Sequence, residues 1–148
     1  MRAVAPYVDM SRFADRVEQI SISGIREVFE AAGDDAINLG LGQPDFPTPA
    51  HARQAAVDAI ESGNADDYTE NKGRIELREA ITAKYDRDQG LDIDPGDVIA
   101  TSGGSEALHL ALAAHVDAGE EVIIPDPGFV SYDALTKLVG GETVPVGL

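Results

Sequence analysis

The C-terminal third of the chain alternates between short apolar runs and helical patterns, and this alternation restricts the fold more than any other feature. Apolar runs occupy 98–101, 122–125 and 143–146, with helical patterns over 105–117 and 131–138 between them. A strand–helix–strand–helix–strand order with short links is typical of a parallel sheet covered by helices. We therefore predict an α/β fold with three parallel strands in this part of the chain.

The residues before this part predict an arm, helices and turns. Residues 1–20 show no clear period and are interpreted as an arm. Thr48 followed by Pro49 is a good helix start, because a capping hydroxyl then precedes a proline in the first turn. The elements expected are a helix over 23–32, a strand over 36–40, a proline-rich loop over 41–49, a helix from Thr48 to Glu61, a helix carrying Leu77, Ile81 and Tyr85 that stops at Gly90, and a turn over 94–97.

The charge balance limits the possible partners. Acidic residues number 27 against 11 basic ones, which gives a net charge of −16. A nucleic-acid partner is not expected, because neutralising phosphates needs a basic face. Two interpretations of the acidity stay open: a solvated surface that keeps the protein soluble, or adaptation to high salt, where self-repulsion is screened. The scarcity of lysine, with three in the chain, favours high-salt adaptation.

Several other classes of protein are not expected either. No run approaches the roughly 18 apolar residues of a membrane span. The first residues lack the apolar region of a signal peptide, so we expect a cytoplasmic protein. The absence of cysteine excludes disulfides and thiolate metal sites. The three histidines have no ligand-like grouping, and we predict no metal site.

The stretch "TSGGSEAL" at 101–108 predicts an anion site where a strand gives way to a helix. It lacks the third glycine of a dinucleotide fingerprint and the lysine of a P-loop. A nucleophile elbow at Ser105 is not supported, because His109 and His115 lie on the same predicted helix and cannot complete a triad. Free N–H groups and the helix dipole favour an anion at such a helix start. A plain glycine turn with a serine cap stays open, and Glu106 and His109 are expected to form a surface pair.

Four stretches together resemble the class I/II aminotransferases. They are "LGQPDFPTP" at 41–49, "YTENKGRIELREAI" at 68–81, "TSGGSEAL" at 101–108 and "IIPDPGFVSYDAL" at 123–135. The resemblance is to fold-type I pyridoxal phosphate (PLP) enzymes, nearest to the aspartate-aminotransferase-like branch. It implies the N-terminal part of a three-layer αβα fold with a mostly parallel sheet. It also implies an arm and small-domain segment over 1–47 and the beginning of the large PLP-binding domain over 48–148.

The resemblance implies a role for each matching site residue. Gly103, Gly104 and Ser105 would hold the phosphate of pyridoxal 5'-phosphate. Phe129 occupies the position of the aromatic residue that stacks on the pyridine ring, and its alternative is an ordinary core aromatic. Tyr68 matches the tyrosine that reaches the phosphate of the partner subunit's cofactor, and its alternative is a packing residue at the surface.

Two further implications concern the substrate and the missing chemistry. Gly42 matches a loop glycine whose backbone lies near the substrate carboxylate, and its alternative is a turn glycine. The family uses a Schiff-base lysine much later in the chain, and Lys72, Lys84 and Lys137 do not match it. We therefore assign no catalytic residue and expect this chain to be inactive by itself.

The function that the resemblance implies is PLP-dependent transfer of an amino group from an amino acid to a 2-oxo acid. The complete enzyme is expected to be a homodimer with sites shared across the interface. One alternative is a PLP-dependent lyase or synthase of the same fold. The other is a non-catalytic truncated or split-gene product that pairs with another chain.

Overall fold

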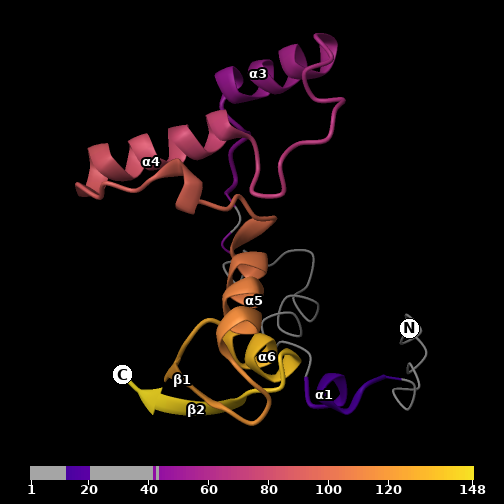
Figure 1. The fold of residues 1–148 in the computed structure, drawn as a ribbon, viewed down its shortest axis with the longest axis vertical. Coiled ribbons are helices and arrows are strands. Elements are labelled where there is room, and N and C mark those ends of the chain that lie inside the picture. Colours follow the sequence, from indigo (N-terminus) through magenta and orange to yellow (C-terminus); the bar gives the residue numbers. More distant parts are fainter. Residues whose placement is uncertain (1–12, 21–41, 43) are drawn as a thin grey trace. The chain divides into compact units, whose positions relative to one another are not determined.

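The structure, a computed structural model, describes residues 13–20, 42 and 44–148 (Figure 1). The chain divides into two compact units, one made of residues 1–40 and 102–148 and the other of residues 41–101. The helix expected over 23–32 and the strand expected over 36–40 lie outside the described residues. The domain boundary predicted between residues 47 and 48 stays a prediction.

The 41–101 unit begins with a loop and the helix α3 (Ala50–Glu61). The helix starts later than predicted, because Pro49, with φ −50° and ψ 141°, has extended rather than helical backbone and occupies the N-cap position. Its carbonyl accepts hydrogen bonds from the amides of Ala52 and Arg53, both at 3.1 Å. The expected cap at Thr48 is therefore wrong, because Pro49 itself takes the N-cap position and no side chain caps this helix.

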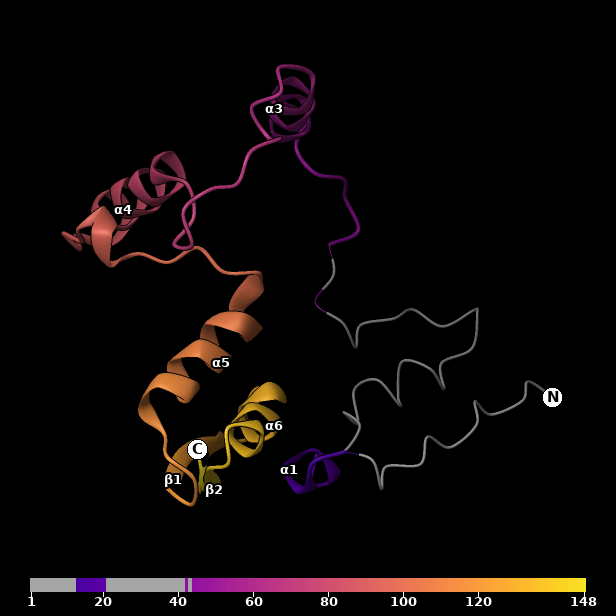
Figure 2. The ribbon, with the colours of Figure 1, turned by 45° about the vertical axis from the view of Figure 1, so that its right-hand side comes forward.

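The helix α4 (Ile75–Gln89) ends as predicted at Gly90, whose φ of 68° is left-handed. Figure 2 shows α3 and α4 as separate helices joined by a long loop. The predicted apolar stripe of α4 is not its buried face, since Leu77 is 50% exposed. The buried side chains of this helix are instead Arg78 and Thr82.

The turn predicted over 94–97 is confirmed as the short 3₁₀ helix η2 (Pro95–Asp97), capped by the Asp94 carboxylate, which accepts from the Gly96 amide at 2.6 Å. The strand predicted over 98–101 is wrong. Val98 is extended, but the segment pairs with no strand of the described residues. The Ala100 amide donates instead to the Lys72 carbonyl of a loop at 2.8 Å. An apolar extended run becomes a strand only when another strand supplies a ladder of hydrogen bonds.

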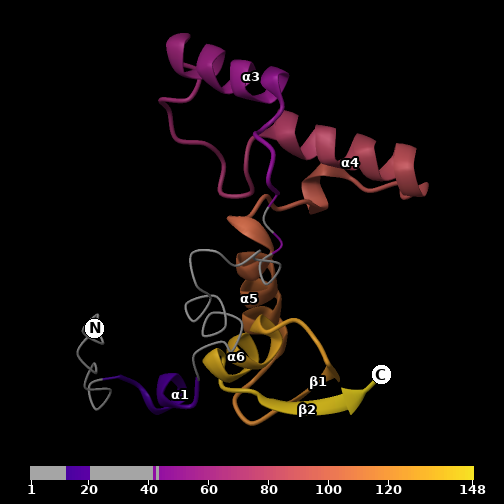
Figure 3. The ribbon, with the colours of Figure 1, turned by 180° about the vertical axis from the view of Figure 1, so that it is seen from behind.

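The other unit contains a parallel βαβ arrangement. Its elements are α1 (Asp15–Glu18), α5 (Gly103–His115), β1 (Glu121–Asp126), α6 (Ser131–Leu138) and β2 (Glu142–Gly147). The strands pair in parallel, with Val122 opposite Thr143 and Ile124 opposite Pro145, and lie side by side in Figures 1 and 3. Helix α6 contacts both strands and packs against α5. Two of the three predicted strands and the helix between them are confirmed.

Two sequence expectations for this unit need correction. Helix α5 begins and ends two residues before the predicted 105–117 range, because Ser102 is its N-cap and Val116 is already extended, with φ −119° and ψ 117°. The predicted arm over 1–20 contains one helical turn, α1, within its described part. A single turn is too short to produce the apolar period by which a helix is recognised.

The packed centre of this unit is small. No apolar side chain of the described residues is buried, and Thr136 of α6 is the side chain most enclosed, at 1% exposure. Ile123 of β1 remains 74% exposed. Parallel strands are typically covered on both faces, so this sheet has apolar surface available for further packing. Among the described residues, no helix is long and apolar enough to cross a membrane.

Candidate functional site

The start of α5 carries the predicted anion site. Gly103 is the first helical residue, and its φ of 81° turns the backbone into the helix from Ser102. Gly104 and Ser105 follow on the exposed first turn. Backbone amides in the first turn of a helix have no partner within the helix itself, and this turn is therefore where helices bind anions.

A carboxylate already lies at this helix start. Glu106 accepts a hydrogen bond from the backbone amide of Ser102 through Oε2. The surface pair expected between Glu106 and His109 is therefore replaced by a contact to the backbone, since the orphan amide and the helix dipole attract the carboxylate. The contact shows that the α5 start presents an amide to an oxyanion.

The same first turn is open enough for a larger anion. A Cβ built on Gly103 or on Gly104 meets no atom of the described residues within 4 Å. Packing among the described residues therefore does not require the absence of a side chain at either position. This turn offers backbone amides, a serine hydroxyl and space beside two glycines. A phosphate needs donors and space of this kind, so these residues fit the phosphate of PLP.

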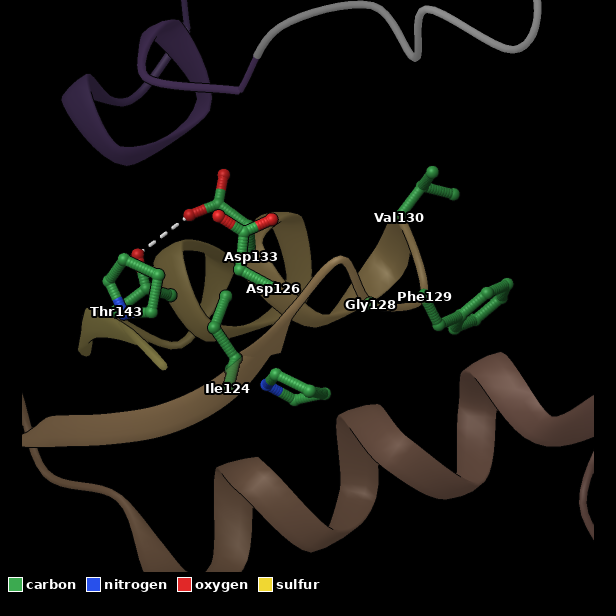
Figure 4. A pocket seen from close by; sticks show the side chains of 9 residues that line it. Ile124, Asp126, Gly128, Phe129, Val130, Asp133 and Thr143 are labelled. Carbon is green, nitrogen blue, oxygen red and sulfur yellow. Dashed lines mark hydrogen bonds between the residues drawn. The ribbon is translucent and has the colours of Figure 1, made fainter. Parts of the chain in front are cut away.

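Phe129 follows β1 and lines a hollow of ≈ 270 Å³ in the same unit. Its ring is 51% exposed and contacts the Tyr132 ring edge to face, with centroids 5.7 Å apart. In Figure 4, Phe129 lies at one end of this hollow and Thr143 at the other. An exposed ring beside an open hollow can stack on a planar ligand, and the stacking role of Phe129 stays a prediction.

Asp133 links α6 to β2 at the end of this hollow that lies away from Phe129. Its Oδ1 accepts from the Thr143 hydroxyl at 2.8 Å (Figure 4). Its Oδ2 accepts from Lys137 Nζ at 2.7 Å. The bond from the Lys137 ammonium, followed by that from the Thr143 hydroxyl, holds the pKa of Asp133 below its ordinary value of 3.8. The sequence analysis missed this residue, although the four-residue spacing to Lys137 on a predicted helix is a usable signal.

Tyr68 belongs to the 41–101 unit and is fully exposed, with a relative exposure of 107%. It lines a hollow of ≈ 300 Å³ together with Glu70 and Arg74. Gly42 is exposed as well and lies in the same unit. The structure thus brings the α5 start and Phe129 into one unit, where α5 packs against α6, and places Tyr68 and Gly42 in the other.

The model of the family described as "Aminotransferase class I and II" matches residues 34–148 of this chain. The chain belongs to this family. A "Probable aspartate aminotransferase" of Methanocaldococcus jannaschii is 44% identical over 135 residues, which cover 91% of this chain and 36% of that protein. An "Aspartate aminotransferase" of Pyrococcus horikoshii is 44% identical over 137 residues, covering 91% and 35%. This aminotransferase-family chain therefore spans about a third of the length of these relatives.

Solved structures show the same fold. An aspartate aminotransferase from Rhizobium meliloti superimposes with a TM-score of 0.83 at 35% identity, covering 93% of this chain and 36% of that one. The Pyrococcus protein A1 superimposes with a TM-score of 0.84 at 41% identity, covering 90% and 35%. The predicted family and the predicted αβα fold class of the aspartate-aminotransferase type are confirmed. The roles of the individual site residues stay predictions.

Proposed function

We propose that this chain supplies the phosphate-binding part of a PLP-dependent aminotransferase, which transfers an amino group from an amino acid to a 2-oxo acid. The observation that carries the proposal is the start of α5, where two exposed glycines and an exposed serine inside the family match form the first turn of the helix. The Methanocaldococcus jannaschii and Pyrococcus horikoshii relatives are aspartate aminotransferases by their printed names, which favours this activity over a lyase or synthase of the same fold.

The residues of this chain would hold the cofactor rather than react with it. The amides of Gly103 and Gly104 and the hydroxyl of Ser105 would bind the phosphate, and Phe129 would stack on the ring. Tyr68 would reach the phosphate of a second copy, and the Gly42 backbone would lie near the substrate carboxylate. When bound, PLP supplies an electron sink for the substrate α-carbon. The residues of this chain would orient the PLP ring.

The wider setting is proposed on the same grounds. We propose a cytoplasmic homodimer whose substrates are an amino acid and a 2-oxo acid, and whose acidic surface is adapted to high salt. The family match supports the substrates and the dimer, and the net charge of −16 supports the salt adaptation. By itself this chain is expected to be inactive, because none of its three lysines matches the family's Schiff-base position.

The test replaces the matching segment of the Pyrococcus horikoshii aspartate aminotransferase with this chain. The chimera is expected to bind PLP, seen as visible absorbance, and to transaminate, whereas the chain alone does neither. Gly104→Asp places a like charge where the phosphate binds and is expected to abolish both properties, while Asp66→Asn on the surface is the matched control. A folded chimera that binds PLP equally with Gly104→Asp contradicts the phosphate site. A chimera that binds PLP without transaminating favours the lyase or synthase alternative.

A further inference from the structure

Arg78 is the buried cation of the 41–101 unit. Its side chain, on the first turns of α4, is 6% exposed, in contrast to the 50% of Arg74. Removing a guanidinium from water costs several kcal/mol unless its donors find partners. A buried arginine therefore needs a structural reason, and the sequence analysis did not single it out.

The guanidinium of Arg78 contacts three separate points of this unit. Its Nε donates to the Gly73 carbonyl at 3.0 Å, and its Nη1 donates to the Pro95 carbonyl at 3.0 Å. Its Nη2 donates to the Glu70 carboxylate at 2.5 Å. Two of these partners lie in the loop 68–73, and the third begins η2. One side chain thus joins the loop to α4 and to η2.

Other bonds fix the same loop against η2 and against the segment that follows it. Lys72 Nζ donates to the Gly96 carbonyl at 2.5 Å, and the Ala100 amide donates to the Lys72 carbonyl at 2.8 Å. Gly73 has a φ of 91°, and a Cβ there would lie 2.7 Å from the Ala100 Cβ. The loop is therefore held at its C-terminal end by close packing and by two cations, while Tyr68 at its other end is fully exposed.

We propose that Arg78 is a positioning residue that holds the loop 68–73 in the conformation in which Tyr68 reaches a cofactor phosphate. The proposal rests on the function proposed above. An exposed tyrosine on a mobile loop would lose conformational freedom on each binding event, and a braced loop has lost it beforehand. The planar guanidinium suits this task, because it donates in several fixed directions, whereas a lysine is a single point charge.

The first test measures amide hydrogen exchange in the 148-residue chain. The reporters are the amides of Gly73 and Ala100, which donate to the loop carbonyls of Glu70 and Lys72. Arg78→Gln is expected to accelerate their exchange about tenfold or more, because the carbonyls of Gly73 and Pro95 and the Glu70 carboxylate lose their donor. The Gly90 amide, which donates to Asp86 at the end of α4, is expected to be unchanged and shows that the helix stays folded.

Two variants complete this measurement. Arg78→Lys keeps the charge but cannot donate to all three partners. Its exchange rates at Gly73 and Ala100 are expected to fall between those of the parent and of Arg78→Gln. Arg87→Gln is the matched control, because Arg87 is an exposed arginine on the same helix that pairs with Asp88. Equal exchange at Gly73 and Ala100 in the parent, Arg78→Gln and Arg87→Gln would overturn the proposal.

The second test asks whether Arg78 acts through Tyr68. The PLP dissociation constant is measured for the chimera and for Arg78→Gln, Tyr68→Phe and the double variant. Each single change is expected to weaken binding, and the double variant to bind within about twofold of Tyr68→Phe, because two residues that act as a unit are not additive. Fully additive effects overturn the positioning role.

The outcomes separate this proposal from the proposed function. A chimera that binds no PLP in any form defeats the proposed function and the positioning role that depends on it. Normal PLP binding by Tyr68→Phe removes the reason for positioning Tyr68 but leaves the phosphate site at α5 intact. Retained PLP binding with unchanged loop exchange in Arg78→Gln overturns the positioning role alone.

Discussion

At the scale of single residues, the adjacent glycines of the α5 start differ in backbone conformation. Gly103 has a φ of 81°, whereas Gly104 is not left-handed, and a Cβ at either meets no atom of the described residues within 4 Å. Gly103→Ala is expected to lower the free energy of unfolding by about 1–2 kcal/mol, because an L-residue is strained there. Gly104→Ala, the matched control, is expected to raise it by up to about 1 kcal/mol through helix propensity. Urea denaturation measures both, and an equal response would contradict the conformation of Gly103.

The pKa of Asp133 is lowered mainly by the Lys137 ammonium and then by the Thr143 hydroxyl. Lys137→Met is therefore expected to raise this pKa toward 3.8 more than Thr143→Val does. Because the folded pKa lies below the unfolded one, the carboxylate adds stability above pH 3.8, and that stability is lost as the pH falls through the folded pKa. NMR titration of the Asp133 carboxyl measures each shift. A larger effect of Thr143→Val would reverse the order of the two causes.

At the scale of elements, Thr136 decides how α6 packs in its unit. Its hydroxyl donates to the Tyr132 carbonyl at 2.8 Å, and its methyl lies 3.1 Å from the position of a Cβ on Gly141, close to the start of β2. Thr136→Ser, which removes the methyl, is expected to cost about 1 kcal/mol of unfolding free energy. Thr136→Val, which keeps the methyl, is expected to change it by less than about 1 kcal/mol, since the lost bond lies within one helix. Thermal unfolding measures the stability of both variants. A larger loss of stability in Thr136→Val than in Thr136→Ser would show that the hydroxyl matters more than the methyl.

At the scale of the whole molecule, the net charge of −16 sets the response to salt. Raising KCl from about 0.1 M to about 2 M is expected to raise the Tm by about 5 °C or more, because the Debye length falls to a few Å and self-repulsion is screened. Asp66→Asn combined with Asp67→Asn removes two exposed charges and is expected to make this rise smaller. A Tm that stays flat between the two salt concentrations would refute salt adaptation and favour an ordinary solvated surface.

The sequence by itself determined what depends on local pattern. The amphipathic run after Val130 predicted α6, a glycine able to adopt left-handed φ predicted the end of α4, and the four ordered motifs predicted the family and its fold. Proline and glycine restrict the backbone wherever they occur, and helical periodicity is a property of neighbouring residues. The glycines and serine of the α5 start were found in the same way, because a helix start is a local structure.

Only the tertiary structure decided what depends on residues distant in sequence. The apolar run 98–101 has the pattern of a strand, yet its Ala100 amide bonds to the Lys72 carbonyl of a loop. An extended run forms a strand only when another strand lies beside it. In the sequence, Arg78 is one more polar residue of a surface helix, but its three partners come from two other segments, the loop 68–73 and η2. Its burial follows from where the chain returns in space, which no pattern of neighbouring residues specifies.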